Sequence, residues 1–223
     1  MTHDTPLISL CQELIRRPST SGHEGEVAQF LQQTMQDLGY DEVFIDRYGS
    51  VLGTIRGNRP GRRVLLDGHI DTVPVADPAQ WTQAPFGGAL VDGRIYGRGA
   101  SDMKGAVAAM VTAAARFVQE TNRDFAGTVY VSCSVQEELF EGVSCREMIR
   151  NAKPDCVIIG EATSTTLKIG QRGRAEIVVE TEGVSCHSSN PEKGVNAVYL
   201  MLPLLEELRH LTPGRHPLLG DGI

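Results

Sequence analysis

Histidine and acidic residues follow several apolar runs in this sequence, and side chains of these types can hold a metal ion. His69 and Asp71 lie two residues apart and follow the apolar run 64–66 after two intervening residues. Residues two apart in a strand point to the same side, and ligands of open α/β sheets bind where strands end. A carboxylate beside a histidine can orient the ring and raise its basicity. Considered alone, however, this pair is better explained by a buried histidine–aspartate hydrogen bond without a metal.

Acidic residues recur at the ends of two further predicted strands. Glu137 and Glu138 follow the apolar strand 128–134, and Glu161 follows the strand 156–160. Asp102 stands before an alanine-rich helix predicted over residues 106–118. Adjacent glutamates often belong to a solvated turn, and an aspartate before a helix is often an N-cap. The repetition of the pattern at three strand ends nevertheless favours a shared site.

One imidazole and several carboxylates form a set of nitrogen and oxygen donors that suits zinc, cobalt or manganese. The carboxylates are too numerous for one ion. A carboxylate shared by two ions about 3.5–4 Å apart, with a water between them, would use the surplus and would support hydrolysis. The loop 97–105 is glycine-rich but lacks the spacing of a phosphate-binding loop.

Composition excludes several other classes of protein. The chain has 223 residues, of which 41% are hydrophobic and 22% charged, and its formal net charge of −7 with no basic cluster argues against a nucleic-acid partner. Five cysteines without a C-x-x-C pair suggest free thiols in a reducing compartment. No stretch resembles a signal peptide or reaches transmembrane length. We therefore expect a cytoplasmic protein without a membrane partner.

Alternating patterns predict an α/β fold in which helices flank a mixed sheet. Two N-terminal helices, strands over 43–45 and 51–55, and the three strands with acidic ends would form a first domain. The pattern of apolar and polar residues changes near Gly173. A partly alternating stretch over 175–182 predicts an antiparallel strand, and a helix is predicted from about Asn196. We expect a catalytic metal-binding domain over 1–172 and a smaller α+β domain over 173–223.

An ordered set of motifs resembles a known family of enzymes. The motifs span the chain from about residue 10 and are Gly68–Pro74, Gly97–Gly99 with Asp102–Gly105, Gln136–Glu138, Gly160–Glu161 and Gly183–His187. They are similar to the co-catalytic zinc hydrolases that include acetylornithine deacetylase, succinyl-diaminopimelate desuccinylase, aminoacylase and glutamate carboxypeptidase. Residues 171–174 and 183–187 most resemble a branch associated with selenium metabolism. The resemblance implies a zinc exopeptidase-like catalytic domain followed by a lid or dimerisation domain.

The resemblance also implies a set of metal ligands. His69, Asp102 and Glu161 would bind one zinc ion. Asp102 would bridge to a second zinc ion, which Glu138 would also bind. A complete active site would thus hold two zinc ions, with cobalt or manganese as substitutes.

The remaining roles come from the same resemblance. Asp71 would orient His69, and Glu137 would be the general base that takes a proton from the bridging water. His187 would reach the active site of the second subunit of a homodimer and stabilise the oxyanion. Arg172 and Asn196 are candidates for substrate contacts.

One departure concerns the second metal. The family carries a further histidine ligand near the end of a longer chain, and His216 is a poor substitute for it. We therefore expect the chain to be truncated at its C-terminus. The leading hypothesis is a metal-dependent amidohydrolase of deacylase or carboxypeptidase type, which cleaves an N-acyl amino acid or short peptide through a metal-bridged water. The alternative is a truncated, non-catalytic relative that serves in metal binding or dimerisation.

Overall fold

A computed structural model of the chain describes residues 5–140, 142–171, 173, 175–212, 214–217 and 220–221. The chain divides into two compact units, Met1–Thr165 and Thr166–Ile223. The first unit contains α1 (Thr5–Ile15), α2 (Gly25–Asp37), β1 (Glu42–Ile45), β2 (Val51–Arg56), β3 (Arg59–His69), η1 (Pro78–Gln80), β4 (Ala89–Val91), β5 (Arg94–Tyr96), η2 (Ala100–Lys104), α3 (Gly105–Thr121), β6 (Ala126–Ser134), α4 (Val143–Ala152) and β7 (Cys156–Ile159). The second contains η3 (Pro191–Lys193), α5 (Ala197–Arg209), β8 (Arg215–His216) and β9 (Gly220–Asp221). The predicted domain boundary after residue 172 stays a prediction.

A five-stranded mixed sheet organises the first unit. Its strand order is β1-β2-β6-β3-β7, in which β3 runs parallel to β6 and β7 while β1 and β2 add antiparallel pairings. The carboxyl ends of β3, β6 and β7 therefore meet at one edge, and the register pairs His69 with Ser134 there. This arrangement confirms the predicted mixed sheet flanked by helices.

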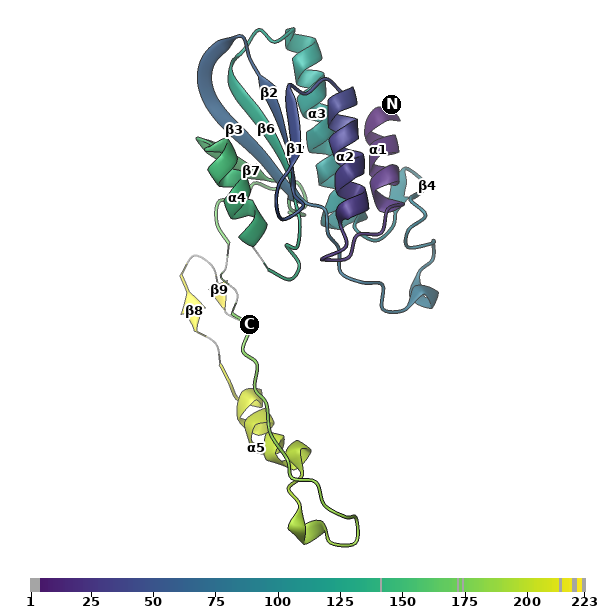
Figure 1. Ribbon diagram of the computed structural model, residues 1–223, viewed down its shortest axis with the longest axis vertical. Helices are drawn as coiled ribbons and strands as arrows, with labels where there is room; N and C mark the ends of the chain where they lie inside the picture. Colours follow the sequence, from purple (N-terminus) through teal and green to yellow (C-terminus); the bar gives the residue numbers. More distant parts are fainter. Residues whose placement is uncertain are drawn as a thin grey trace. The chain divides into compact units, whose positions relative to one another are not determined.

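Alternating side chains explain why helices cover both faces of the sheet (Figure 1). Val51, Ile55 and Val131 belong to the main core, which they share with residues of α1, α2 and α3. Leu52 of β2 and Leu65 of β3 belong to a second cluster and pack instead with Met148 of α4. A side chain added at Gly68 would begin 2.7 Å from the terminal methyl groups of two methionines, so this glycine lets α3 approach the end of β3 closely.

The turn before α3 differs from the sequence-based expectation. α3 begins at Gly105, and its N-cap position is occupied by Lys104. Asp102 lies in the preceding turn η2 with a non-helical backbone (φ −128°, ψ 98°), so it is not an N-cap. This geometry leaves the Asp102 carboxylate available to the edge of the sheet.

The second unit lacks one predicted strand. Residues 175–182 are in no strand, and no described segment pairs with them. An isolated strand leaves its backbone hydrogen-bonding groups without partners, which explains why alternation alone did not produce one here. Ile177 remains 84% exposed.

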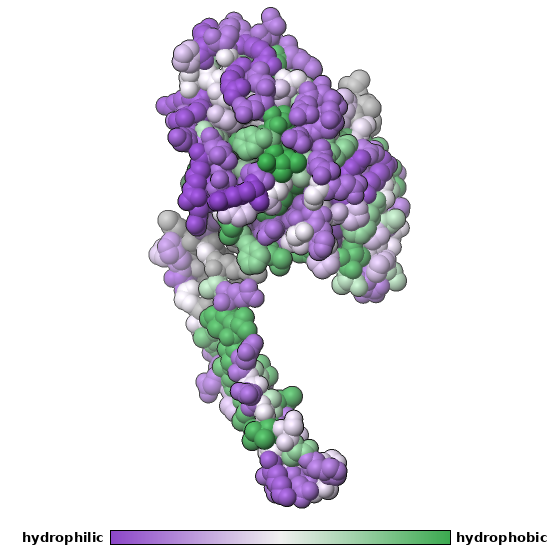
Figure 2. All heavy atoms as spheres, in the orientation of Figure 1, coloured by the Kyte–Doolittle hydropathy of each residue, from purple (hydrophilic) through white to green (hydrophobic). Residues whose placement is uncertain are grey.

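Apolar side chains also gather on the surface of α5 (Figure 2). Its exposed apolar residues are between 49% and 69% accessible; they are Val198, Tyr199, Leu200, Leu202, Leu205 and Leu208. Surfaces of this kind mark contacts with other proteins or with further chain.

Within the described part of the chain, no helix is both long and apolar enough to cross a membrane. All five cysteines are free.

Candidate metal centre

His69 occupies the carboxyl end of β3, where the imidazole is 2% exposed. Its Nε2 lies 2.9 Å from Oδ1 of Asp102. Its Nδ1 lies 3.0 Å from the carbonyl oxygen of Asp71 and 3.5 Å from Oδ1 of the same residue. Contacts to Asp71 therefore fix the ring on one side and direct Nε2 toward the carboxylates on the other.

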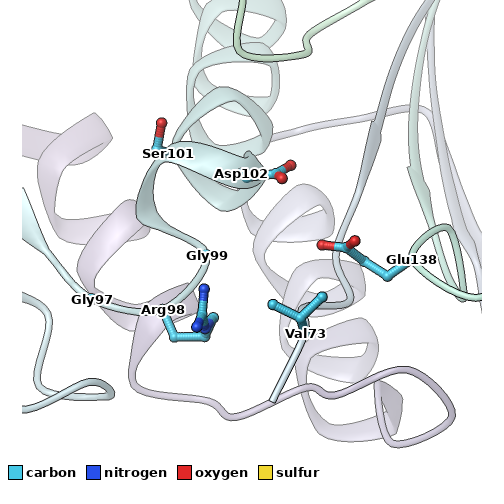
Figure 3. Close-up of a pocket in the computed structure, with 7 residues that line it drawn as sticks. All are labelled: Val73, Gly97, Arg98, Gly99, Ser101, Asp102 and Glu138. Atoms are coloured by element: carbon cyan, nitrogen blue, oxygen red, sulfur yellow. The ribbon is translucent and has the colours of Figure 1, made fainter. Parts of the chain in front are cut away.

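The glutamates that follow β6 and β7 meet at the same imidazole. Oε1 of Glu161 lies 3.7 Å from His69 Nε2, and Oε2 of Glu137 lies 3.9 Å from it. Glu138 places a carboxylate oxygen in a group with His69 and Asp102 whose ligand atoms lie within 4.8 Å of one another. In Figure 3 the carboxylates of Asp102 and Glu138 point toward one another across a cavity. The structure thus brings His69 together with Asp102 before α3 and with the three glutamates that follow β6 and β7, as the sequence pattern predicted.

Asp71 is fully buried and anchors the loop that carries the two glutamates. Its Oδ1 accepts the backbone N–H of Glu137 at 3.1 Å. Its Oδ2 accepts the backbone N–H of Glu138 at 3.1 Å and the hydroxyl of Ser21 at 2.6 Å. The carboxylate therefore holds His69 and both glutamates at once, a wider role than the orientation of one ring.

A segment far from these residues in sequence supports all of them. We call residues 14–24, the end of α1 and the turn into α2, the supporting turn. Ser19 Oγ donates to the carbonyl of Ile70, and Ser21 donates to Asp71. Glu24 accepts the backbone N–H of Gln136 at 3.0 Å. One short segment therefore contacts the loops that follow β3 and β6.

Lys104 lies in η2, the turn that carries Asp102, and joins it to the supporting turn. Its side chain is 1% exposed, and Nζ donates to the carbonyl oxygens of Leu14 (2.9 Å) and Arg17 (2.8 Å). Burial lowers the pKa of Lys104 to about 8. Sequence reasoning missed both Lys104 and the supporting turn. The polar stretch between the two N-terminal helices was the available signal, but it resembles any solvated turn.

The titration of these groups reflects an acidic cluster around one imidazole. Burial disfavours the charged ring, but hydrogen bonds and charges from Asp71, Asp102 and Glu137 outweigh burial and raise the pKa of His69 to about 10. Burial and then the nearby carboxylates raise the pKa of Glu138, and burial with the charge of Asp102 also raises that of Glu161. Carboxylates that repel one another in this way favour a bound cation.

The donor set fits a zinc-like ion. Two ligands about 2.0–2.2 Å from zinc lie at most about 4.4 Å apart, and the ligand atoms of His69, Asp102 and Glu138 lie within 4.8 Å of one another. Only small side-chain movements would close this difference. The chemistry of the donors, one neutral nitrogen and several carboxylate oxygens, also suits zinc, cobalt and manganese.

A family profile matches the part of the chain that carries this cluster. The profile is that of peptidase family M20/M25/M40, and it covers residues 65–201. This span is more than half of the chain and includes all five clustered residues. The chain belongs to peptidase family M20/M25/M40.

Individual curated relatives match nearly the whole of this chain. The protein YgeY of Escherichia coli (strain K12) is 38% identical over 215 residues, which are 95% of this chain and 53% of YgeY. Succinyl-diaminopimelate desuccinylase 2 of Ruegeria sp. (strain TM1040) is 33% identical over 216 residues, 92% of this chain and 54% of the relative. The chain therefore spans about half the length of the curated relatives that it matches.

Two solved structures share the fold. The M20 family metallo-carboxypeptidase Sso-CP2 of Sulfolobus solfataricus matches with a TM-score of 0.61 and 26% identity, over 69% of this chain and 37% of that protein. Human carnosine dipeptidase 1 matches with a TM-score of 0.59 and 21% identity, over 70% of this chain and 38% of the other, which supports the fold alone. Together these likenesses confirm the α/β architecture of an M20 catalytic domain.

Three further predicted site residues belong to the second unit. His187 is exposed, and its Nδ1 lies 2.8 Å from the hydroxyl of Ser189. Asn196 caps α5 by accepting the backbone N–H of Val198 at 2.9 Å. Arg172 lies outside the described residues. The functional roles of all three stay predictions.

Proposed function

We propose that the complete gene product is a metal-dependent amidohydrolase that cleaves the amide bond of an N-acyl amino acid or a short peptide. The convergence of His69 with the glutamates that follow β6 and β7 and with Asp102 before α3 supports this proposal most strongly. The peptidase family and the names of the relatives, a desuccinylase and a metallo-carboxypeptidase, point to the same class of bond. Zinc is the metal that we propose, two ions for each complete site.

The ligands divide between the two ions in our proposal. His69, Asp102 and Glu161 would hold one ion, and Asp102 with Glu138 would hold the other. When bound, the ions would polarise the amide carbonyl and lower the pKa of the attacking water. Asp71 occupies the Nδ1 side of the His69 ring, which would leave Nε2 free to bind the first ion.

Glu137 would be the general base. Its Oε2 lies 3.9 Å from His69 Nε2, so it stands at the edge of the ligand cluster. It would accept a proton from the attacking water while the new carbon–oxygen bond forms. It would then deliver that proton to the nitrogen as the carbon–nitrogen bond breaks, leaving a carboxylate and an amine.

The second unit would complete the site in a homodimer. The exposed apolar residues of α5 offer a surface for association with a second copy (Figure 2). His187 of one copy would then stabilise the oxyanion in the site of the other, while Arg172 and Asn196 would contact substrate. A cytoplasmic location is consistent with the free thiols.

A substrate screen with defined metals tests the proposed function. The purified complete gene product is stripped with a chelator, reloaded with zinc, cobalt or manganese, and incubated with N-acyl amino acids and dipeptides. We expect metal-dependent release of free amine and its loss in a Glu137→Gln control. Tight metal binding without turnover of any substrate would instead support the non-catalytic alternative.

A further inference from the structure

Three consecutive residues of η2 face three different parts of the first unit. The Asp102 carboxylate points toward Glu138 (Figure 3), and its only hydrogen bond among the described residues is the 2.9 Å contact with Nε2 of His69. Met103 is fully buried, and Lys104, which is 1% exposed, reaches α1 instead. The position of Asp102 therefore depends on how its two neighbours in η2 are held.

Met103 packs against the glycines that come directly before two of the proposed ligands. A Cβ placed on Gly68 would lie 2.7 Å from the terminal methyl of Met103, and one placed on Gly160 would lie 3.1 Å from it. These glycines precede His69 and Glu161 in the sequence. Met103 thus fixes how closely η2 approaches the ends of β3 and β7, but apolar packing is non-directional and does not orient the turn.

Lys104 supplies the directional contact. Its ammonium donates to the carbonyl oxygens of Leu14 and Arg17 at the C-terminal end of α1. Carbonyls at a helix end lack intrahelical donors, and the helix dipole favours a cation there. The Lys104 backbone N–H also donates to the Gly99 carbonyl at 2.8 Å, which joins the two ends of η2. A buried ammonium is costly unless it is hydrogen-bonded, so these carbonyls determine where the side chain lies.

The end of α1 leads into the supporting turn, which also holds the loop after β3. Ser19 Oγ donates to the Ile70 carbonyl at 2.7 Å, and the Ser19 carbonyl accepts the Thr72 N–H at 2.9 Å. The backbone segments that carry His69 and Asp102 are thus bonded separately to one short stretch of chain. That stretch sets the position of one proposed ligand relative to the other.

We propose that Lys104 is a positioning residue of the metal centre, which holds η2 on the end of α1 so that Asp102 meets His69 at a shared ion. The inference rests on the proposed function, in which both side chains are metal ligands. Lys104 acts only through the turn, because its ammonium is buried against α1 and bonds to backbone carbonyls. Without the ammonium, η2 keeps its apolar packing and loses its directional contact.

The substitution Lys104→Met separates positioning from an effect of charge. Removing a positive charge from the turn that carries Asp102 would by itself strengthen cation binding, whereas loss of the directional contact should weaken it. We expect zinc affinity, measured by chelator competition on the complete gene product, to fall about 10- to 100-fold, the usual effect of removing a group that orients a ligand. The visible spectrum of the cobalt-loaded protein should change. At saturating zinc, kcat should fall while KM changes less than about threefold.

Two further variants serve as controls. The Tyr40 hydroxyl is buried and donates to the Val111 carbonyl of α3 at 2.9 Å, so Tyr40→Phe also loses a buried hydrogen bond but leaves η2 intact. It should lower the unfolding midpoint and keep the zinc affinity and cobalt spectrum of the wild type. Lys104→Arg keeps the charge and the donors in a larger group, so its zinc affinity should lie between those of the wild type and Lys104→Met. It takes the place of Lys104→Met if that variant does not fold.

Metal binding is measured without turnover, so its outcome is separate from that of the proposed function. A wild-type protein that binds zinc but hydrolyses no substrate would refute the proposed hydrolysis, while a weaker zinc affinity in Lys104→Met would still support the positioning role. Tighter zinc binding, or wild-type affinity with an unchanged cobalt spectrum, in the folded Lys104 variant would overturn the assignment.

Discussion

The substitution Asp71→Asn tests how one buried carboxylate organises the metal centre. Oδ1 of Asp71 faces two donors, the Glu137 N–H and Nδ1 of His69. An amide NH₂ group placed there would oppose both. Placed at the Oδ2 position, it would face the Ser21 hydroxyl, which can rotate to accept, and the Glu138 N–H, which cannot. The asparagine should therefore adopt the second orientation.

The expected losses of stability and metal affinity follow from this orientation of the asparagine. One part-buried N–H, that of Glu138, is left without its acceptor, at a cost of up to about 1–3 kcal/mol. The imidazole also loses the adjacent negative charge, and removing such a partner usually weakens metal affinity about 10- to 100-fold. The loop can relax when the protein is free of metal, but in our proposal ligation by Glu138 would prevent that relaxation. We therefore expect the greater loss at the ion that Glu138 binds.

Metal titration followed by atomic absorption and activity assay measures this effect. Asp71→Asn should remain folded, lose the more weakly held ion first and lose activity about 10- to 100-fold. Ser21→Ala, which removes only one donor to the carboxylate, is the matched control and should have a smaller effect. In the double variant the rotated hydroxyl is gone, so the two effects should not be additive. Unchanged affinity for both ions in Asp71→Asn would refute the reasoning.

Three other predictions concern neighbouring groups. Glu137→Gln in the complete gene product should retain metal while kcat falls by about 10²- to 10⁴-fold; loss of metal in atomic absorption would instead make Glu137 a ligand. Because the pKa of His69 is raised to about 10, that group stabilises the metal-free fold fully below pH 6.5 and loses this contribution as pH rises through 10. Zinc must displace the same proton, so its affinity, measured by competition with a chelator, should rise up to about tenfold per pH unit between 6.5 and 10; a flat profile would contradict the raised pKa. Mixing His187→Ala with Glu137→Gln protein should restore some activity if His187 acts across a dimer, and mixed dimers that remain inactive would exclude that role.

Much of the metal centre could be predicted because strand ends are local signals. The apolar run before His69 and the run before Glu137 each end within a few residues of the site, and parallel pairing brings such ends to one edge. The sheet class was also predictable, since alternating residues such as Leu65 and Leu66 separate the two helical layers.

The rest depends on contacts between distant segments. Nothing local to Ser21 indicates that it will meet Asp71, and nothing local to Lys104 indicates that its amine will reach the end of α1. Arg98 also escaped prediction, because only the folded loop brings it to the cavity that Asp102 and Glu138 line. The strand predicted over 175–182 was wrong because alternation specifies a face but not a partner.

The supporting turn also determines when the metal centre can form during folding. The bond from Gln136 to Glu24 joins residues 112 positions apart, and Glu161 follows later still. On the ribosome, α1 and α2 emerge long before the strand ends that they brace, so no ion can be held by the complete ligand set until β7 has been synthesised. Such distant pairings are slow to form. A metal ion would therefore stabilise a finished domain by mass action rather than nucleate it.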